Sequence, residues 1–186
     1  AGRAALEPLL VSPPGADAED FGQFAALQHG VDLVLEEPHA RALVTAPIEK
    51  KAAQAEGLVH PGHTEYLAAR AEIEDFAMAM LGPSLRVVLA TIHLPLAKVP
   101  QTLSVEGIVR AGDLLLRALR DDYEIPRPRL ALLGLNPHAG EGGVLGHEDE
   151  SIVAPAVAEL ARRFPEAQVT GPLPADTAFP QHARGH

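Results

Sequence analysis

Apolar residues recur at intervals of three and four along several segments of the chain, the spacing that places them on one face of a helix. The pattern predicts helices over residues 21–37, 49–56, 64–75, 104–119 and 148–164. The segment 104–119 is the most clearly amphipathic, with an apolar side formed by Ile108, Leu114, Leu115 and Leu119. The segment 148–164 begins with three carboxylates, Glu148, Asp149 and Glu150, which suit the positive end of a helix dipole.

Shorter apolar runs separate these helices and predict buried strands over residues 41–45, 85–90, 129–133 and 167–170. Strands that alternate with helices are typical of an α/β layered fold with a largely parallel sheet. Residues 1–20 show no such pattern and are expected to be poorly organised, so the α/β core is expected to occupy residues 21–186.

Four polar loops rich in glycine or proline each follow one of the predicted strands, at residues 45–50, 91–96, 136–143 and 171–177. Ligands bind outside the carboxyl ends of the strands in open parallel sheets. We therefore expect the four loops to share one edge of the sheet and to build one site.

The composition narrows the classes of function. The chain of 186 residues is 47% hydrophobic but only 4% aromatic, so its core must come from Ala, Val, Leu and Ile. A net charge of −10 argues against a nucleic-acid partner. The absence of cysteine excludes disulfides and thiolate metal sites and fits a reducing cytoplasm. Neither a membrane-spanning run nor a signal peptide is expected, because no apolar stretch reaches about 18 residues and the N-terminus lacks a basic segment followed by an apolar one.

The segment 134–146 (GLNPHAGEGGVLG) contains the most suggestive chemistry, since it holds Asn136, His138 and Glu141 among four glycines. Glycine lets the backbone approach a ligand closely and adopt positive φ angles. Pro137 fixes the turn before His138, whose neutral imidazole could bind a metal. The alternative is a tight turn in which this histidine hydrogen-bonds a backbone carbonyl.

Two further loops place a histidine at the end or the beginning of an element. His93 follows the strand predicted over residues 85–90, and its apolar neighbours favour a partly desolvated, neutral imidazole suited to a metal. The alternative is a buried histidine bonded to the backbone. His63 and Thr64 precede a predicted helix, where Thr64 could cap the first turn. Alternatively, both side chains bind an anionic or hydroxylated substrate at the helix N-terminus.

Lys50 and Asp176 are weaker candidates for the same site. Lys50 opens a predicted helix, where a cation opposes the helix dipole unless a phosphate lies nearby, and the alternative is a solvated surface lysine. Asp176 stands in a proline-rich loop and could bind a ligand, orient a histidine, or cap a turn. No dinucleotide fingerprint, P-loop, HExxH or CxxC motif occurs. The residues alone therefore indicate an α/β protein with a loop-built, histidine-rich site able to hold a metal.

Five motifs in a fixed order carry a resemblance to a known family: VTAPIEKKA (44–52), PGHTEYLA (61–68), TIHLPL (91–96), GLNPHAGEGGVLGHE (134–148) and GPLPADTAF (171–179). Together they resemble the 4-hydroxythreonine-4-phosphate dehydrogenase family of pyridoxal phosphate biosynthesis, over nearly all of residues 20–179. The resemblance implies oxidation of 4-phosphohydroxy-L-threonine by NAD or NADP. Loss of CO2 from the product would then give 3-amino-2-oxopropyl phosphate.

The resemblance also implies an architecture like that of the isocitrate and isopropylmalate dehydrogenases, with two α/β/α domains around a cleft. Members are homodimers that share a metal site between subunits. By resemblance, His93 and His138 match metal ligands, and His63 and Thr64 match substrate contacts. Lys50, Asn136, Glu141 and Asp176 are further candidate contacts, and no catalytic acid or base is assigned.

The implied cofactors are NAD or NADP and a divalent metal, either zinc, magnesium or cobalt. The metal would lower the pKa of the substrate hydroxyl and stabilise the enolate formed on decarboxylation, while the nicotinamide accepts the hydride.

The chain also departs from the family pattern at both ends. Residues 1–20 lack the strand and Gly/Pro-rich loop with which the family begins, and no YHDQG-like motif with a third metal histidine follows residue 179. We therefore expect a chain truncated at both ends that lacks one metal ligand. Two alternatives stay open: a related dehydrogenase acting on a cis-dihydrodiol carboxylate or another hydroxy acid, and an inactive fragment that binds only metal or a partner.

Overall fold

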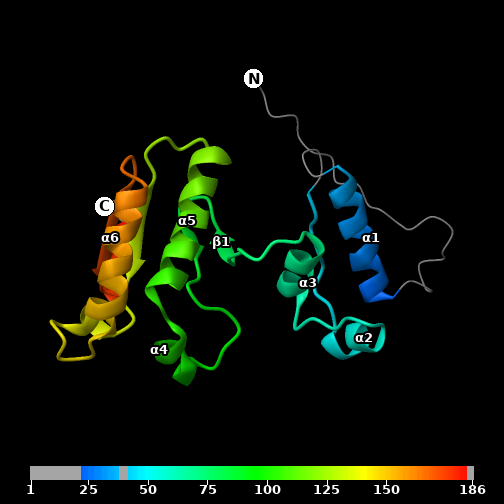
Figure 1. Cartoon of the computed structure of the whole chain (residues 1–186), viewed down its shortest axis with the longest axis horizontal. Coiled ribbons are helices and arrows are strands. Elements are labelled where there is room, and N and C mark those ends of the chain that lie inside the picture. Colours follow the sequence, from blue (N-terminus) through cyan, green and yellow to red (C-terminus); the bar gives the residue numbers. More distant parts are fainter. Residues whose placement is uncertain (1–21, 38–41, 184–186) are drawn as a thin grey trace. The chain divides into compact units, whose positions relative to one another are not determined.

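The computed structural model describes residues 22–37 and 42–183. It divides into two compact units, Ala1–Glu74 and Asp75–His186, each of which is described by itself (Figure 1). The expectation for residues 1–20 lies outside the described residues. Within the described ranges, no helix is both long and apolar enough to cross a bilayer.

The first unit contains the helices α1 (Gln23–Glu36), α2 (Lys50–Ala55) and α3 (His63–Arg70), close to three of the predicted helices. Its buried core comprises Phe24, Leu27, Val31, Ala53, Leu58 and Tyr66. The rings of Phe24 and Tyr66 meet edge to face, with centroids 5.2 Å apart. Arg70 ties α3 to α1, because its guanidinium donates to Asp32 and to the Tyr66 hydroxyl.

Two predictions for the first unit are wrong. The strand predicted over residues 41–45 is absent: Arg41 lies outside the described residues, residues 42–49 form no regular structure, and Val44 is 93% exposed. A strand needs a neighbour to pair with, and the described part of this unit offers only helices. The helix predicted to reach Asp75 ends at Arg70 instead, because Glu72 adopts a left-handed conformation with φ 55°.

The second unit alternates strands and helices along the chain. Its elements are β1 (Ala79–Leu81), β2 (Arg86–Val88), η1 (Leu96–Lys98), α4 (Val99–Thr102), α5 (Val105–Asp121), β3 (Arg129–Leu133), η2 (Pro137–Gly140), η3 (Asp149–Val153), α6 (Ala154–Arg163), β4 (Gln168–Leu173) and α7 (Ala175–Ala183). The helix predicted over residues 148–164 is confirmed in position, but its first turn, η3, is a π-helix.

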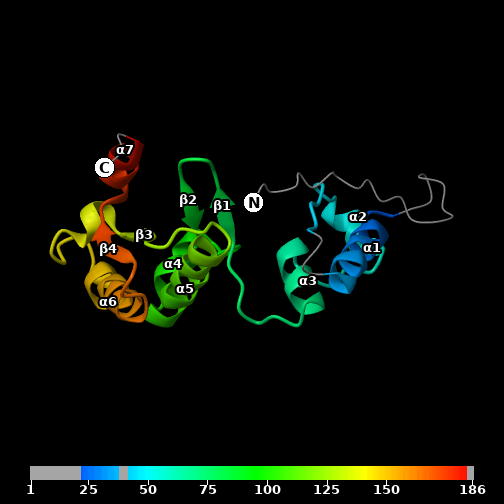
Figure 2. The same cartoon turned by 90° about the horizontal axis from the view of Figure 1, so that it is seen from above.

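Two strand pairs are present among the described residues. β3 and β4 are parallel, with Arg129 opposite Gln168 and Leu130 opposite Val169. β1 and β2 form an antiparallel hairpin (Figure 2). The mixed α/β class and the parallel pairing are therefore confirmed. The hairpin was not predicted, because the three residues of β1 are too few to show a period.

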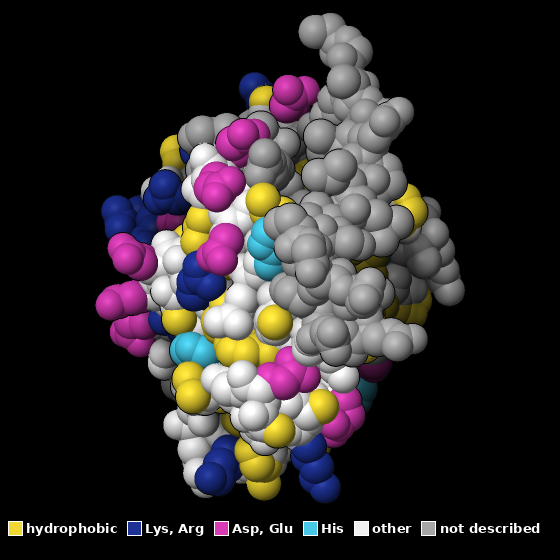
Figure 3. All heavy atoms as spheres, turned by 90° about the vertical axis from the view of Figure 1, so that its right-hand side faces the viewer, with side chains coloured by type: hydrophobic (Ala, Val, Ile, Leu, Met, Phe, Trp, Pro, Cys, Tyr) yellow, Lys and Arg dark blue, Asp and Glu magenta, His cyan; other side chains and the backbone are white. Residues whose placement is uncertain are grey.

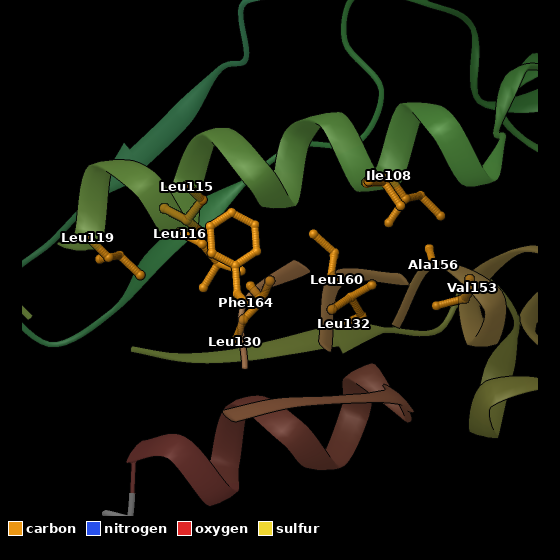
Figure 4. Packing of buried hydrophobic residues seen from close by; sticks show 11 residues of the cluster. Ile108, Leu115, Leu116, Leu119, Leu130, Leu132, Val153, Ala156, Leu160 and Phe164 are labelled. Atoms are coloured by element: carbon orange, nitrogen blue, oxygen red, sulfur yellow. The ribbon is translucent and has the colours of Figure 1, made fainter. Parts of the chain in front are cut away.

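The core of the second unit lies where α5 and α6 pack against β3. The side chains of Ile108, Leu115, Leu116 and Leu119 point from α5 toward Leu130, Leu132, Leu160 and Phe164 (Figure 4). Leu116 and Leu160 are fully buried. Leu160 packs directly against the backbone of α5 at Gly112, because a Cβ on this glycine would lie only 2.6 Å from the Leu160 Cδ1. Leu114, expected on the same apolar side, is only half-buried and lies outside this cluster.

Charged side chains of both signs are interspersed on the described surface shown in Figure 3. On α6, the carboxylate of Glu159 accepts hydrogen bonds from Arg162 Nε at 2.8 Å and from Arg163 Nε at 2.7 Å. These two guanidinium groups lower the pKa of Glu159 to about 2.

Replacing Glu159 with glutamine should therefore lower stability in a pH-dependent way. A carboxyl whose pKa is lowered in the folded state contributes stability above its unfolded pKa and loses that contribution as the pH falls toward the folded value. We expect the difference in free energy of unfolding between parent and variant to be full above about pH 5 and to vanish toward about pH 2. Urea denaturation across this range measures it. Glu166→Gln is the control, because its contact with Arg120 is 3.8 Å long, and equal curves for the two variants would contradict the prediction.

Candidate functional site

The loops that follow β3 and β4 meet at one edge of the parallel pair, as the sequence predicts for loops at the carboxyl ends of neighbouring strands. His138 lies in the first loop, and Asp176 opens α7 after the second. The Nδ1 atom of His138 is 3.8 Å from Oδ2 of Asp176, and the two side chains are 60% and 59% exposed. The structure thus brings together two of the predicted site residues.

The backbone around His138 is unusual for residues that carry a Cβ. His138, Ala139 and Glu141 have φ angles of 53°, 53° and 46°, in the left-handed region. Each such residue costs on the order of 1–3 kcal/mol, and such residues cluster at functional sites. Gly140 follows the same handedness with φ 80°. The loop therefore needs other contacts to hold it in this form.

Asp149 supplies those contacts. Its side chain is 1% exposed, and its Oδ1 and Oδ2 accept hydrogen bonds from the backbone N–H groups of Leu135 at 2.6 Å and Asn136 at 2.9 Å. Next to it, Glu148 Oε2 accepts a hydrogen bond of 2.9 Å from Asn136 Nδ2, which is the main cause of a lowered pKa at Glu148. Sequence reasoning assigned both acids only a helix-dipole role and missed their contacts with the loop.

Two other candidates of the second unit, His93 and Glu141, are exposed. His93 has φ 54° and an exposed side chain, because β2 ends at Val88 and the chain has left the sheet before the histidine. Its predicted desolvated setting is therefore wrong. Glu141 is also exposed. The ranges that the structure describes contain no group of three or more His, Asp or Glu side chains placed to hold a metal ion.

The first unit holds Lys50, His63 and Thr64. Lys50 is exposed at the start of α2, which is capped by the Glu49 carboxylate through the N–H groups of Lys51 and Ala52 at 3.1 and 2.8 Å. Thr64 does not cap α3, because the helix begins at His63 with Gly62 as its N-cap. The Nε2 atom of His63 is buried without a hydrogen-bond partner in the described structure.

Behind the loops of the second unit lies an apolar cavity of about 720 Å³. Its walls include Val87 and Val88 of β2, Leu130 and Leu132 of β3, and apolar residues of α5. Ala178, Phe179 and His182 of α7 line it as well, from the side of β3 opposite α5 (Figure 4). Thr91 and Gly134 line it where the chain enters the two loops, so the cavity reaches the edge that carries His138.

Comparison with known proteins decides the family. Residues 9–186 match the sequence model of the family described as "Pyridoxal phosphate biosynthetic protein PdxA". The chain belongs to this family. Among curated relatives, the 4-hydroxythreonine-4-phosphate dehydrogenase of Erythrobacter litoralis is 51% identical over 148 residues, which is 78% of this chain and 44% of that protein. The enzyme of the same name from Synechocystis is 46% identical over 144 residues, covering 74% of this chain and 41% of that protein.

Similar solved structures agree with this assignment. The 4-hydroxythreonine-4-phosphate dehydrogenase of Klebsiella pneumoniae superposes with a TM-score of 0.77 at 41% identity, covering 87% of this chain and 48% of that one. A terephthalate 1,2-cis-dihydrodiol dehydrogenase from Burkholderia xenovorans gives a TM-score of 0.66 at 28% identity, covering 86% of this chain and 50% of that one. The family resemblance drawn from the five motifs is confirmed. The chain spans about half the length of the relatives that it matches.

Proposed function

We propose that this chain forms part of a dehydrogenase that oxidises the hydroxyl group of 4-phosphohydroxy-L-threonine with NAD or NADP and a divalent metal. The oxidised product would lose CO2 to give 3-amino-2-oxopropyl phosphate for pyridoxal phosphate biosynthesis. Membership of the PdxA family and the activity for which the relatives are named support this proposal. The observation that carries it in the structure is the left-handed, glycine-rich loop that presents His138 to Asp176 at the sheet edge.

In this proposal His138 and His93 are metal ligands. Imidazole donors suit zinc or cobalt, whereas magnesium would need mostly oxygen ligands. A carboxylate that is hydrogen-bonded to one ring nitrogen can orient a histidine and leave the other nitrogen for a metal. Oδ2 of Asp176 lies 3.8 Å from Nδ1 of His138, near that position but beyond hydrogen-bond distance. Catalytic metals usually have three protein ligands, and the described residues do not gather three. The two histidines are therefore an incomplete set, and no reaction step is assigned through the metal.

His63, Thr64 and Lys50 are the proposed contacts for the substrate. The buried Nε2 of His63 lacks a partner in the described structure, and a buried polar atom without a hydrogen bond costs about 1–3 kcal/mol. A substrate oxygen would satisfy it at the first turn of α3. Lys50 contributes an exposed positive charge for the phosphate. In the second unit, Asn136 and Glu141 are proposed contacts in the loop that holds His138.

The resemblance further supports three features of this proposal. They are an isocitrate dehydrogenase-like arrangement of α/β/α layers in two domains, a homodimer that shares its metal site between subunits, and a cytoplasmic location.

An assay of the complete polypeptide that the gene encodes tests the proposal. The protein is stripped of metal, loaded with a divalent cation, and mixed with NAD or NADP and 4-phosphohydroxy-L-threonine. We expect reduced nicotinamide when cation and phosphorylated substrate are both present, none without the cation, and much less from unphosphorylated 4-hydroxy-L-threonine. A folded, cation-loaded protein that produces no reduced nicotinamide would rule out this substrate.

A second function is favoured by the likeness to the terephthalate dihydrodiol dehydrogenase of Burkholderia xenovorans. A cis-dihydrodiol carboxylate offers a hydroxyl and a carboxylate, and no phosphate. Turnover of such a compound in the same assay, without turnover of the phosphorylated amino acid, would establish it. Cation binding without turnover of either compound would instead indicate the inactive, metal-binding alternative.

A further inference from the structure

Among the described residues, Asp149 is the charged residue that is buried, with 1% of its surface exposed. Burial of a carboxylate is costly unless hydrogen bonds replace its water. Both oxygens are occupied here, one by Leu135 N–H at 2.6 Å and the other by Asn136 N–H at 2.9 Å. Apolar residues fill the rest of this core, so the position of a carboxylate at residue 149 calls for a specific reason.

The reason lies in where β3 ends. The last backbone bond from this strand to its neighbour runs from Gly134 N–H to the Leu173 carbonyl at 2.8 Å. The next two N–H groups, those of Leu135 and Asn136, donate to Asp149 instead of to β4. The Asp149 carboxylate therefore replaces the β4 carbonyls as the hydrogen-bond acceptor for these two N–H groups. The chain leaves β4 at this point, two residues before His138.

Two glycines allow the loop to close around the carboxylate. A Cβ on Gly134 would lie 3.0 Å from Oδ1 of Asp149, and a Cβ on Gly140 would lie 3.5 Å from Oδ2. Gly140 also has φ 80° and passes so near the Gly146 carbonyl that a Cβ would lie 2.8 Å from it. Both the beginning and the middle of the loop are thus in contact with one side chain, which stands on the first turn leading into α6.

We propose that Asp149 is the positioning residue of this loop. It offsets the cost of the left-handed residues His138, Ala139 and Glu141 and thereby fixes the direction of the His138 imidazole toward Asp176. Glu148 reinforces the same arrangement from outside through Asn136 Nδ2. Both oxygens of Asp149 accept from backbone N–H groups, so it acts on His138 through the backbone. The expected effect of Asp149 on dehydrogenase activity rests on the proposed function. Its expected effect on the conformation of the loop does not.

Asp149→Asn tests this role in the complete polypeptide. The variant keeps the shape of the side chain. Its NH2 group cannot accept a hydrogen bond, so the backbone N–H of either Leu135 or Asn136 loses its acceptor. We expect faster hydrogen exchange at the amides of Leu135 and Asn136, changed nitrogen shifts of the His138 ring by NMR, and an affinity for Co²⁺ alone that is lower by about 10–100-fold. We expect kcat per folded molecule to fall while the KM for the nicotinamide cofactor stays the same. The folded fraction must be measured alongside, because unfolding alone also lowers the apparent kcat without changing KM.

Glu150→Gln is the matched control, because Glu150 lies on the same turn with a 75% exposed side chain, and it should leave all these readouts unchanged. If Asp149→Asn does not fold, Glu148→Ala decides, since it removes only the outer bond and should move the same His138 signals less. Unchanged His138 signals and unchanged amide exchange in a folded Asp149→Asn protein would overturn the proposal. Where that variant is unfolded, unchanged His138 signals in Glu148→Ala would overturn it. A protein without dehydrogenase activity would refute the proposed function but leave the NMR and exchange readouts to decide this one.

Discussion

Replacing Leu160 with alanine is expected to lower the free energy of unfolding by about 2–5 kcal/mol. Leu160 is fully buried between α6 and α5, and its Cδ1 lies 2.6 Å from the position that a Cβ on Gly112 would take. The truncation leaves a cavity between two helices that the sheet holds in place, so the site cannot collapse to fill it. Urea denaturation followed by circular dichroism measures the loss. Leu96→Ala is the control, because Leu96 is 85% exposed and such surface changes stay within about 0.5 kcal/mol.

The contact with Gly112 makes this prediction sharper. Gly112→Ala alone should destabilise, since its new methyl group would lie 2.6 Å from the Leu160 Cδ1. In the double variant with Leu160→Ala the same methyl group enters the vacated space. We therefore expect the double variant to be more stable than the sum of the single effects predicts, by at least about 1 kcal/mol. Strict additivity would show that the two residues do not share this space.

Replacing His138 with alanine is expected to have the largest effect on the proposed reaction. Loss of residues that only orient metal ligands already costs about 10–100-fold in metal affinity or activity. Loss of a ligand should therefore cost at least about 100-fold in affinity for Co²⁺ and in kcat/KM. Calorimetric titration and the nicotinamide assay on the complete polypeptide measure these changes.

His147→Ala provides the comparison for this variant. His147 follows the same glycine-rich segment, is 78% exposed, and has Glu150 at 3.8 Å as its acidic neighbour, so it resembles His138 in exposure and in its pairing with a carboxylate. The comparison thus shows whether the loss depends on the position of His138 or only on the removal of an exposed histidine. Equal losses from the two variants, or no loss from His138→Ala, would remove His138 from the proposed metal set.

The sequence predicted those elements best that carry their own signal. The strand over residues 129–133 has the bounds that the apolar run predicts, and the helix predicted over residues 104–119 is found at Val105–Asp121 with the Ser104 hydroxyl accepting a bond from Gly107 N–H. A long amphipathic segment contains enough turns to fix its period. The strand predicted over residues 41–45 failed because a short apolar run becomes a strand only when a neighbour is present to pair with it.

The candidate site, too, was predicted from the sequence only in part. The positions of the loops after β3 and β4 followed from the order of the elements, and this was sufficient to place His138 near Asp176. The role of Asp149 did not follow, because three acids at a helix start already have a local explanation in the dipole. Only the packing shows that one of them is buried while its neighbours Glu148 and Glu150 are not. A cap at Thr64 and a desolvated His93 were likewise local inferences that the backbone path does not support.

The cavity between β2 and β3 has a consequence for how this chain behaves in concentrated solution. Among the described residues, β2 pairs with β1 and β3 pairs with β4, so each strand turns one unpaired edge toward the same apolar space. Backbone N–H and C=O groups on such an edge are a template for intermolecular strand addition. Within the described residues, these two edges are therefore the places where strand addition between copies would begin.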